Sequence, residues 1–252
     1  MNTTILLSTQ RSGTTFFDAK INGMCGMDGQ GGELISPRFY LRHNVEHLIQ
    51  MDRSKFNKHK HFKPRFNPKK TPNYVKGYVD ITTEFLKTIN KHSPYAMYNV
   101  MYNALKNDVE KIKNITSPVI HLIRRDLWAK AISGYVTDVT NTAHVKDDKQ
   151  STIDVTIDKQ RLIKFCERLY PIVNQFDQAM RKQSNVMTLY YEDVTKKETW
   201  TSKFISNLEN FMKVKFTDVK FNPPYKKTRD YVNIVNKDDI MDPEMIKKFY
   251  IQ

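Results

Sequence analysis

Short apolar runs recur along the chain, and a polar turn and then a helical pattern follow several of them. The clearest runs are Thr3–Leu7, Val119–Ile123 and Val186–Tyr190. They are rich in aliphatic and β-branched residues and too short for typical helices, so they predict buried strands. Strands that alternate with helices are typical of a parallel sheet covered on both faces. The pattern therefore predicts an α/β fold, with residues 1–252 forming a single domain around a central parallel sheet flanked by helices.

Apolar residues at three- and four-residue steps predict the helices. One further strand is expected over Tyr74–Thr82, where β-branched residues alternate with polar ones. Two polar stretches without a steady period, 36–73 and 137–157, are expected to be loops or insertions. The helices are expected over 15–24, 83–91, 97–114, about 158–182 with Asp158 as its cap, about 197–213, and 242–250 with Pro243 in the first turn.

The turn after the first strand carries the residues of an anion site. A strand that turns directly into a helix leaves backbone N–H groups unpaired at the helix start, and the helix dipole adds positive charge there. Gly13 lets the backbone come close to a ligand, Ser12, Thr14 and Thr15 offer hydroxyl donors, and Arg11 adds a fixed charge. These features predict a P-loop-like, phosphate-binding strand–loop–helix. The alternative is an ordinary turn in which a hydroxyl side chain caps the helix.

This turn is not the usual nucleoside triphosphate loop, which has the pattern G-x-x-x-x-G-K-[ST]. Ser8 stands where that pattern has its first glycine, and Thr14 stands where it has lysine. The cation instead precedes the glycine, at Arg11. A magnesium-triphosphate geometry is therefore not expected.

A second anion site is predicted where the strand Val119–Ile123 ends. Arg125 and Ser133 are eight residues apart. A helix that begins near Asp126 places Ser133 about two turns along it. A guanidinium and a hydroxyl in this arrangement can hold one phosphate together.

Three segments resemble the sulfotransferases that use 3′-phosphoadenosine 5′-phosphosulfate (PAPS), in particular the bacterial trehalose-type and heparan N-sulfotransferases. The segment TQRSGTTFF resembles their 5′-phosphosulfate loop. Arg125 and Ser133 match the family's R-x(7)-S motif for the 3′-phosphate, and YEDV at 191–194 resembles its Y-E-D-L segment. The motifs occur in the family's order, and the resemblance runs from Thr3 to about Tyr231.

The resemblance implies transfer of a sulfuryl group from PAPS to a hydroxyl or amine of an acceptor, without a metal. It offers two general bases. Glu33 matches by its place in GQGGELISPR, and Asp80 by its place in VDITTEFL; a loop glutamate and a structural aspartate are the alternatives. Arg11 replaces the lysine of most relatives and is expected to act electrostatically. The implied PAPS-binding residues are Gln10, Arg11, Ser12, Gly13, Thr14, Thr15, Arg125, Ser133, Tyr191 near the adenine, and Lys226 and Lys227 in a basic C-terminal segment.

The charge of the chain favours anionic partners. Lys and Arg number 41 against 27 Asp and Glu, which gives a formal net charge of +14. The most basic stretch, 52–73, has eight Lys or Arg and three Phe. Basic residues interleaved with aromatic ones also bind single-stranded nucleic acid. A nucleic-acid-binding protein is therefore one alternative to a sulfotransferase, but it does not account for three ordered motifs. A P-loop-like nucleotide kinase is the other, and the missing G-K-[ST] argues against it.

The remaining expectations concern partners and location. The acceptor is expected to be a small molecule or a glycan, with a carbohydrate or lipid hydroxyl as the default by analogy. The apolar stripe of the helix at 158–182 is either core or a homodimer surface. Cys25 and Cys166 are not expected to form a disulfide framework, no signal peptide is expected at the N-terminus, and no apolar run reaches about 20 residues. A cytoplasmic protein is expected.

Overall fold

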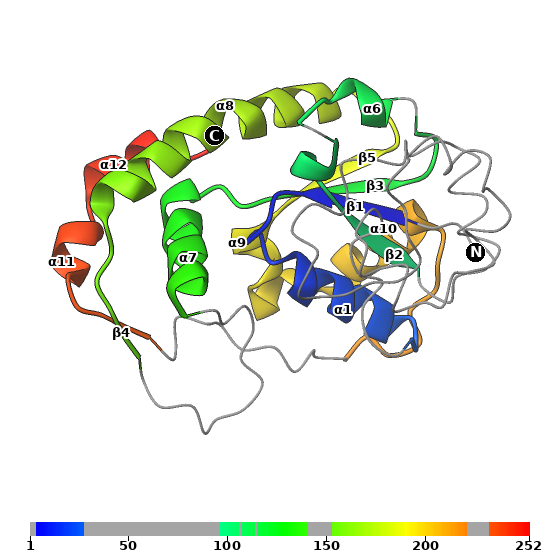
Figure 1. Ribbon diagram of the computed structural model, residues 1–252. Helices are drawn as coiled ribbons and strands as arrows, with labels where there is room; N and C mark the ends of the chain where they lie inside the picture. Colours follow the sequence, from blue (N-terminus) through cyan, green and yellow to red (C-terminus); the bar gives the residue numbers. More distant parts are fainter. Residues whose placement is uncertain (1–3, 28–95, 106, 114, 141–152, 221–231) are drawn as a thin grey trace, which may run out of the picture.

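A central parallel sheet organises the molecule (Figure 1). The computed structural model describes residues 4–27, 96–105, 107–113, 115–140, 153–220 and 232–252. Within them, the sheet has the strand order β2-β1-β3-β5, and every neighbouring pair is parallel. This confirms the predicted α/β fold with helices on both faces of a parallel sheet. The strands are β1 Thr4–Ser8, β2 Met97–Met101, β3 Val119–Ile123 and β5 Val186–Tyr190.

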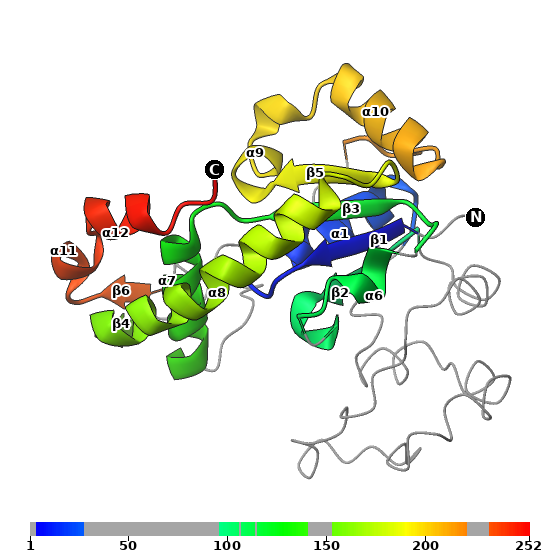
Figure 2. The ribbon, with the colours of Figure 1, turned by 90° about the horizontal axis from the view of Figure 1, so that it is seen from above.

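A second, smaller sheet pairs β4 with β6 in parallel. Figure 2 shows this pair beside α7, beyond the end of the central sheet toward which β1 points. The elements outside the central sheet are α1 Thr14–Met24, η1 Tyr102–Leu105, α6 Glu110–Lys113, α7 Leu127–Thr140, β4 Ile153–Val155, α8 Lys159–Met180, α9 Tyr191–Val194, η2 Lys197–Thr199, α10 Ser202–Met212, β6 Val232–Ile234, α11 Lys237–Ile240 and α12 Pro243–Lys248.

The central sheet divides the core into two halves. Successive side chains of a strand point to opposite faces. Leu6 of β1 therefore joins a cluster with Phe17 of α1 and Leu208 of α10. Leu7 points the other way and joins a cluster with Phe176 of α8. In Figure 1, α8 accordingly lies above the sheet and α1 below it. All residues of β1, β2 and β3 are buried, as expected for parallel strands covered on both faces.

The order of the described strands creates a switch point between β1 and β3. From β1 the chain continues to β2 on one side, and from β3 it continues to β5 on the other side. Ligands of open α/β sheets bind at such a point, outside the carboxyl ends of the strands. Ser8 at the end of β1 donates a hydrogen bond of 2.5 Å from Oγ to the Leu122 carbonyl oxygen. This bond holds the two strand ends together at the switch point.

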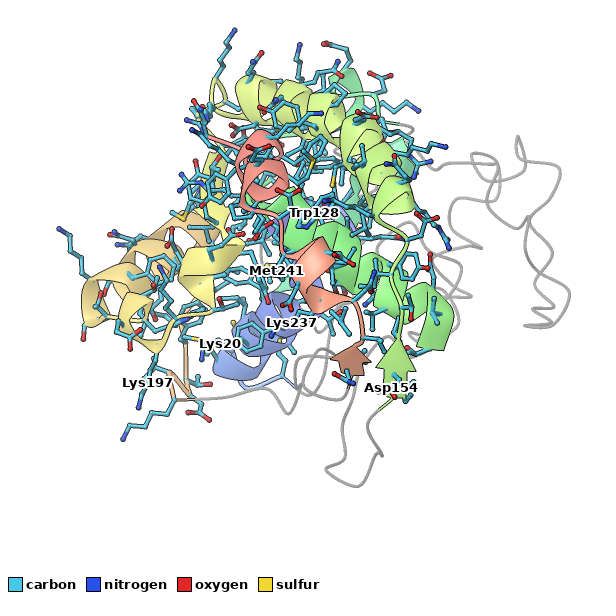
Figure 3. All side chains as sticks on the ribbon, turned by 90° about the vertical axis from the view of Figure 1, so that its left-hand side faces the viewer. Lys20, Trp128, Asp154, Lys197, Lys237 and Met241 are labelled. Carbon is cyan, nitrogen blue, oxygen red and sulfur yellow. The ribbon has the colours of Figure 1, made fainter. Side chains whose placement is uncertain are left out.

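The C-terminal elements are fixed to α7 by Trp128, which is fully buried. Its Nε1 donates to the Ile240 carbonyl oxygen at 2.7 Å, and its ring stacks on that of Phe249 with centroids 6.3 Å apart. Figure 3 shows Trp128 between α7 and the C-terminal helices. Pro243 occupies the first turn of α12, as the sequence predicts, and Asp242 caps the helix.

The predicted cap of the long helix is also confirmed. The Asp158 carboxylate accepts hydrogen bonds from the backbone N–H groups of Gln160 and Arg161 at the start of α8. The helix expected near 197–213 is divided into η2 and α10, because Thr201 begins a new helix by accepting a bond from the Phe204 N–H.

Two predictions of secondary structure are wrong. Residues 97–114 are not one helix but a strand, a 3-10 turn and a short helix, β2, η1 and α6. β2 is buried on both faces, so its apolar residues follow no strand alternation, and pairing with β1 outweighs their helical spacing. The loop expected over 137–157 is wrong at both ends, because 137–140 complete α7 and 153–155 form β4.

The strand at 74–82, the helix at 83–91 and the loop at 36–73 lie outside the described residues. Among the residues that are described, no helix is both long enough and apolar enough to cross a membrane.

Candidate functional site

The turn from β1 to α1 has the strained backbone of a ligand-binding loop. Arg11 has a φ of 62° and Gly13 a φ of 76°, both in the left-handed region. Gly13 is the N-cap of α1, and its carbonyl oxygen accepts the Phe17 N–H at 3.0 Å. The helix begins at Thr14, one residue before the predicted position. The first backbone N–H groups of α1 therefore follow directly on the loop, at the switch point of the sheet.

The Tyr191 ring lies between this loop and Arg124, the residue after β3. A Cβ added at Gly13 would lie 2.4 Å from both Cδ2 and Cε2 of Tyr191, so the backbone of the loop touches the ring edge. The Arg124 guanidinium lies 4.8 Å from the centroid of the same ring. Gly13 follows β1, Arg124 follows β3 and Tyr191 follows β5, so residues from the ends of three strands meet around the Tyr191 ring.

The two consecutive arginines after β3 diverge. Arg124 faces the loop, and its Nη1 donates to the Arg11 carbonyl oxygen at 3.2 Å. The Arg125 guanidinium instead lies 3.5 Å from the centroid of the Tyr190 ring and interacts with Tyr250 in the C-terminal segment. The structure thus brings Arg124 into contact with the loop, whereas the Arg125 guanidinium lies against the last residue of β5.

Glu192 fixes the turn between β3 and α7. Its two carboxylate oxygens accept the backbone N–H groups of Arg125 at 3.2 Å and Asp126 at 3.1 Å. Asp126 in turn accepts the Ala129 N–H at 2.7 Å and caps α7. Glu192 of the Y-E-D segment is therefore a structural residue that orients the backbone of this turn. Asp193 points elsewhere, to Lys196 at 3.3 Å.

The site is positively charged and partly removed from water. Burial lowers the pKa of the Arg11 guanidinium, with Asp138 acting in the opposite direction. Lys130 of α7 is only 2% exposed and donates a hydrogen bond to the Thr9 hydroxyl. Burial lowers the pKa of Lys130 well below 10.5, the charge of Arg124 lowers it further, and Cys166 opposes both. Such a cluster of cations favours an anionic ligand.

The structure brings together one group of the predicted residues. Gly13 of the loop lies against Tyr191, Ser12 and Thr14 beside it are buried, and Ser133 lies within α7. The predicted residues in the described ranges are Gln10, Arg11, Ser12, Gly13, Thr14, Thr15, Arg125, Ser133 and Tyr191. Glu33, Asp80, Lys226 and Lys227 lie outside those ranges.

Lys130 and Thr9 are site residues that the sequence analysis missed. Lys130 lies three residues after Leu127 and directly before Ala131, and both of these are buried. A lysine on the apolar face of a helix that follows an anion-binding motif is the signal that would have found it. No cluster of three metal-ligating side chains occurs in the part of the chain that the structure describes.

No protein-family model matches the chain, and no curated protein matches it. Among solved structures, the chain is similar to a sulfotransferase domain from the curacin biosynthetic pathway, with a TM-score of 0.48 and 13% identity over 98% of this chain and 89% of that one. It is also similar to mouse sulfotransferase SULT7A1 complexed with PAP, with a TM-score of 0.45 and 13% identity over 98% of this chain and 82% of that one. The fold and the site described above depend on contacts within this chain and on neither likeness.

Proposed function

We propose that the chain is a sulfotransferase that moves a sulfuryl group from PAPS to a hydroxyl or amine of an acceptor. The observation that carries the proposal is the contact between two of its motifs, the loop before α1 and the tyrosine of the Y-E-D segment, beside the arginine that precedes the third motif. The loop before α1, Arg124 after β3 and Tyr191 after β5 are far apart in the sequence, yet the Tyr191 ring lies against both Gly13 and Arg124. These residues meet at the switch point, where a parallel sheet binds ligands.

In the proposed site, the loop holds the 5′-phosphosulfate. The N–H groups at the start of α1 and the hydroxyls of Ser12, Thr14 and Thr15 donate to its oxygens. Arg11 stabilises the negative charge that develops on the bridging oxygen as the sulfur–oxygen bond breaks. It does so as a fixed charge, because a guanidinium does not give up its proton.

The acceptor oxygen or nitrogen forms the new bond to sulfur, and its proton passes to a carboxylate, Glu33 or Asp80. The 5′-phosphate of the nucleotide leaves with the electron pair of the broken bond. Catalysis then consists of positioning and charge stabilisation, as in phosphoryl transfer, and the proposal includes no metal.

The remaining proposed roles concern the nucleotide and the acceptor. Arg125 and Ser133 hold the 3′-phosphate together with Lys226 and Lys227, and Tyr191 lies near the adenine. Residues 1–252 act as one sulfotransferase domain, and the stretches 36–73 and 137–157 serve the acceptor side. The acceptor is a small molecule or glycan, with a carbohydrate or lipid hydroxyl as the default.

The first test is ligand-induced stabilisation. We expect adenosine 3′,5′-bisphosphate (PAP), the desulfonated product, to raise the melting temperature more than adenosine 5′-phosphate does, and more than ATP with magnesium. A ligand at 100 times its dissociation constant adds about 2.7 kcal/mol of stability, which a thermal shift assay detects readily. Preferential stabilisation by ATP with magnesium would favour a kinase, and no shift with any nucleotide would remove the sulfotransferase proposal.

Arg124 and Arg125 are expected to bind different phosphates of the nucleotide, Arg124 at the 5′ position and Arg125 at the 3′ position. Arg125→Ala should weaken binding of PAP about tenfold or more, on the scale of one charged hydrogen bond, and leave binding of adenosine 5′-phosphate nearly unchanged. Arg124→Ala should weaken both, because Arg124 contacts the loop itself. Isothermal titration calorimetry with the two nucleotides checks this. Equal losses for both nucleotides in Arg125→Ala would contradict its assignment to the 3′-phosphate.

A further inference from the structure

Lys130 is a buried cation without a carboxylate partner in the described part of the chain. Its side chain is 2% exposed, and its polar contact is the hydrogen bond to the Thr9 hydroxyl. None of the ion pairs among the described residues includes it. Burying an unpaired charge is costly, so a lysine in this place needs either a neutral amine or negative charge from elsewhere.

A chain of hydrogen bonds leads from Lys130 through Thr9 to Ser12 of the anion-binding loop. The hydroxyl oxygens of Thr9 and Ser12 are 2.8 Å apart, and Ser12 is fully buried. An ammonium group can only donate hydrogen bonds, whereas each hydroxyl has one proton to donate and two lone pairs to accept with. Either hydroxyl can be the donor in the Thr9–Ser12 contact. An ammonium that donates to Thr9 polarises the Thr9 O–H and makes it the better donor, so that Thr9 donates to Ser12 and the proton of Ser12 is free to be donated onward.

We propose that Lys130 is a positioning residue of the anion-binding loop, and that its ammonium directs the hydroxyls of Thr9 and Ser12 so that Ser12 donates to the bound anion. The anion in turn supplies the negative charge that the surroundings of Lys130 lack. The inference rests on the proposed function to the extent that the anion is the 5′-phosphosulfate of PAPS. Hydrogen bonds in such a chain polarise and strengthen one another.

In this arrangement, anion binding is coupled to protonation of the Lys130 amine. The groups that face the Lys130 ammonium are Thr9 from the loop, Arg124 from the end of β3 and Cys166 from α8. Burial raises the pKa of the Cys166 thiol to about 12, so this group stays neutral near pH 8. A bound anion raises the lowered pKa of Lys130. Binding therefore takes up a proton wherever the amine is neutral in the free protein, and affinity falls as the pH rises through the pKa of the bound form.

Lys130→Met should have opposite effects on stability and on binding. It removes the buried charge but keeps an unbranched side chain of similar length, so the free protein should become more stable. The unfolded lysine keeps its pKa near 10.5, so the wild-type protein gains stability as the pH rises toward that value, and the variant lacks this gain. Binding of PAP should weaken about tenfold to 100-fold, on the scale of lost charged hydrogen bonds.

Calorimetric titration with PAP at pH 8, in two buffers that differ in ionisation enthalpy, measures affinity and proton uptake together. We expect proton uptake in the wild-type protein and less in Lys130→Met. Thr9→Val should weaken PAP binding but leave the proton uptake by Lys130 in place. Thr9→Ser keeps the hydroxyl and should bind PAP with wild-type affinity. Lys20→Met is the matched control. Lys20 is also a buried lysine, 5% exposed, but it belongs to α1 (Figure 3), and its Nζ lies 4.5 Å from the centroid of the Trp200 ring.

Unchanged affinity and unchanged proton uptake in Lys130→Met would overturn the inference. A loss of binding together with a loss of stability would also overturn it, because that result describes a merely structural lysine. If wild-type protein does not bind PAP, the proposed function fails, and the inference is decided with inorganic sulfate against chloride at matched ionic strength. Stabilisation by sulfate that Lys130→Met loses and Lys20→Met keeps supports the role of Lys130; equal stabilisation of all three proteins overturns it.

Discussion

Arg11→Ala is expected to slow the breakdown of PAPS at least ~100-fold, which is the scale of removing one donor that stabilises charge in a transition state. The φ of 62° at Arg11 and its partly buried guanidinium place a fixed charge in the loop between β1 and α1. Release of PAP from PAPS with water as the acceptor measures this rate without knowledge of the natural acceptor.

Two variants make this result interpretable. Arg11→Lys keeps a cation and should retain part of the rate, although an ammonium lacks the planar fork of donors. Arg168→Ala removes an exposed arginine on α8, which lies 5.8 Å from the Phe165 ring centroid, and should leave the rate unchanged. A rate for Arg11→Ala close to that of the wild-type protein would exclude Arg11 from the chemistry.

Gly13→Ala is expected to weaken PAP binding at least ~100-fold and to lower the melting temperature. Holding an alanine in the left-handed region costs about 1–2 kcal/mol. The added Cβ would also lie 2.4 Å from two ring carbons of Tyr191, so either the loop or the ring must move. Both changes disturb the N–H groups at the start of α1. Calorimetry and thermal unfolding of the same samples check the two effects.

The chain offers a matched control for this substitution. Gly134 lies within α7, and an added Cβ there meets no atom within 4 Å. Gly134→Ala should therefore leave binding unchanged and stabilise the helix by about 0.5–1 kcal/mol. Tyr191→Ala removes the clash but also the proposed adenine contact, so the double variant Gly13→Ala/Tyr191→Ala is compared with Tyr191→Ala alone, and the difference between them is the cost of the backbone strain. Wild-type affinity in Gly13→Ala would mean that the loop adapts and that its contact with Tyr191 does not fix it.

The sequence predicted the strands and the loop of the candidate site because their signals are local. Thr4–Ser8 and Val119–Ile123 are apolar runs followed at once by polar turn residues, and Gly13 marks the turn. β2 was predicted wrongly because it is buried on both faces, and periodicity alone does not separate such a strand from a helix.

The rest of the site depends on contacts between distant residues. Lys130 meets Thr9 across 121 positions, and no local pattern marks that contact. The sequence does not distinguish Arg124 from Arg125 as the residue that contacts the loop. Their side chains point in different directions only because Arg124 packs against Tyr191 and Arg125 against Tyr190. The choice between Glu33 and Asp80 as the base remains a prediction from the resemblance.

The parallel sheet has a consequence for the order in which the protein assembles. Parallel strands cannot be joined by a tight hairpin, so every strand pair described here encloses a long segment of chain. Pairings between distant segments form slowly, because loop closure costs entropy before the contacts repay it. Gly13, Arg124 and Tyr191 belong to three such segments, so a folding intermediate that lacks β5 also lacks the complete anion site. A nucleotide that binds this site acts only on the finished sheet, and it slows loss of the native state without accelerating the early steps of folding.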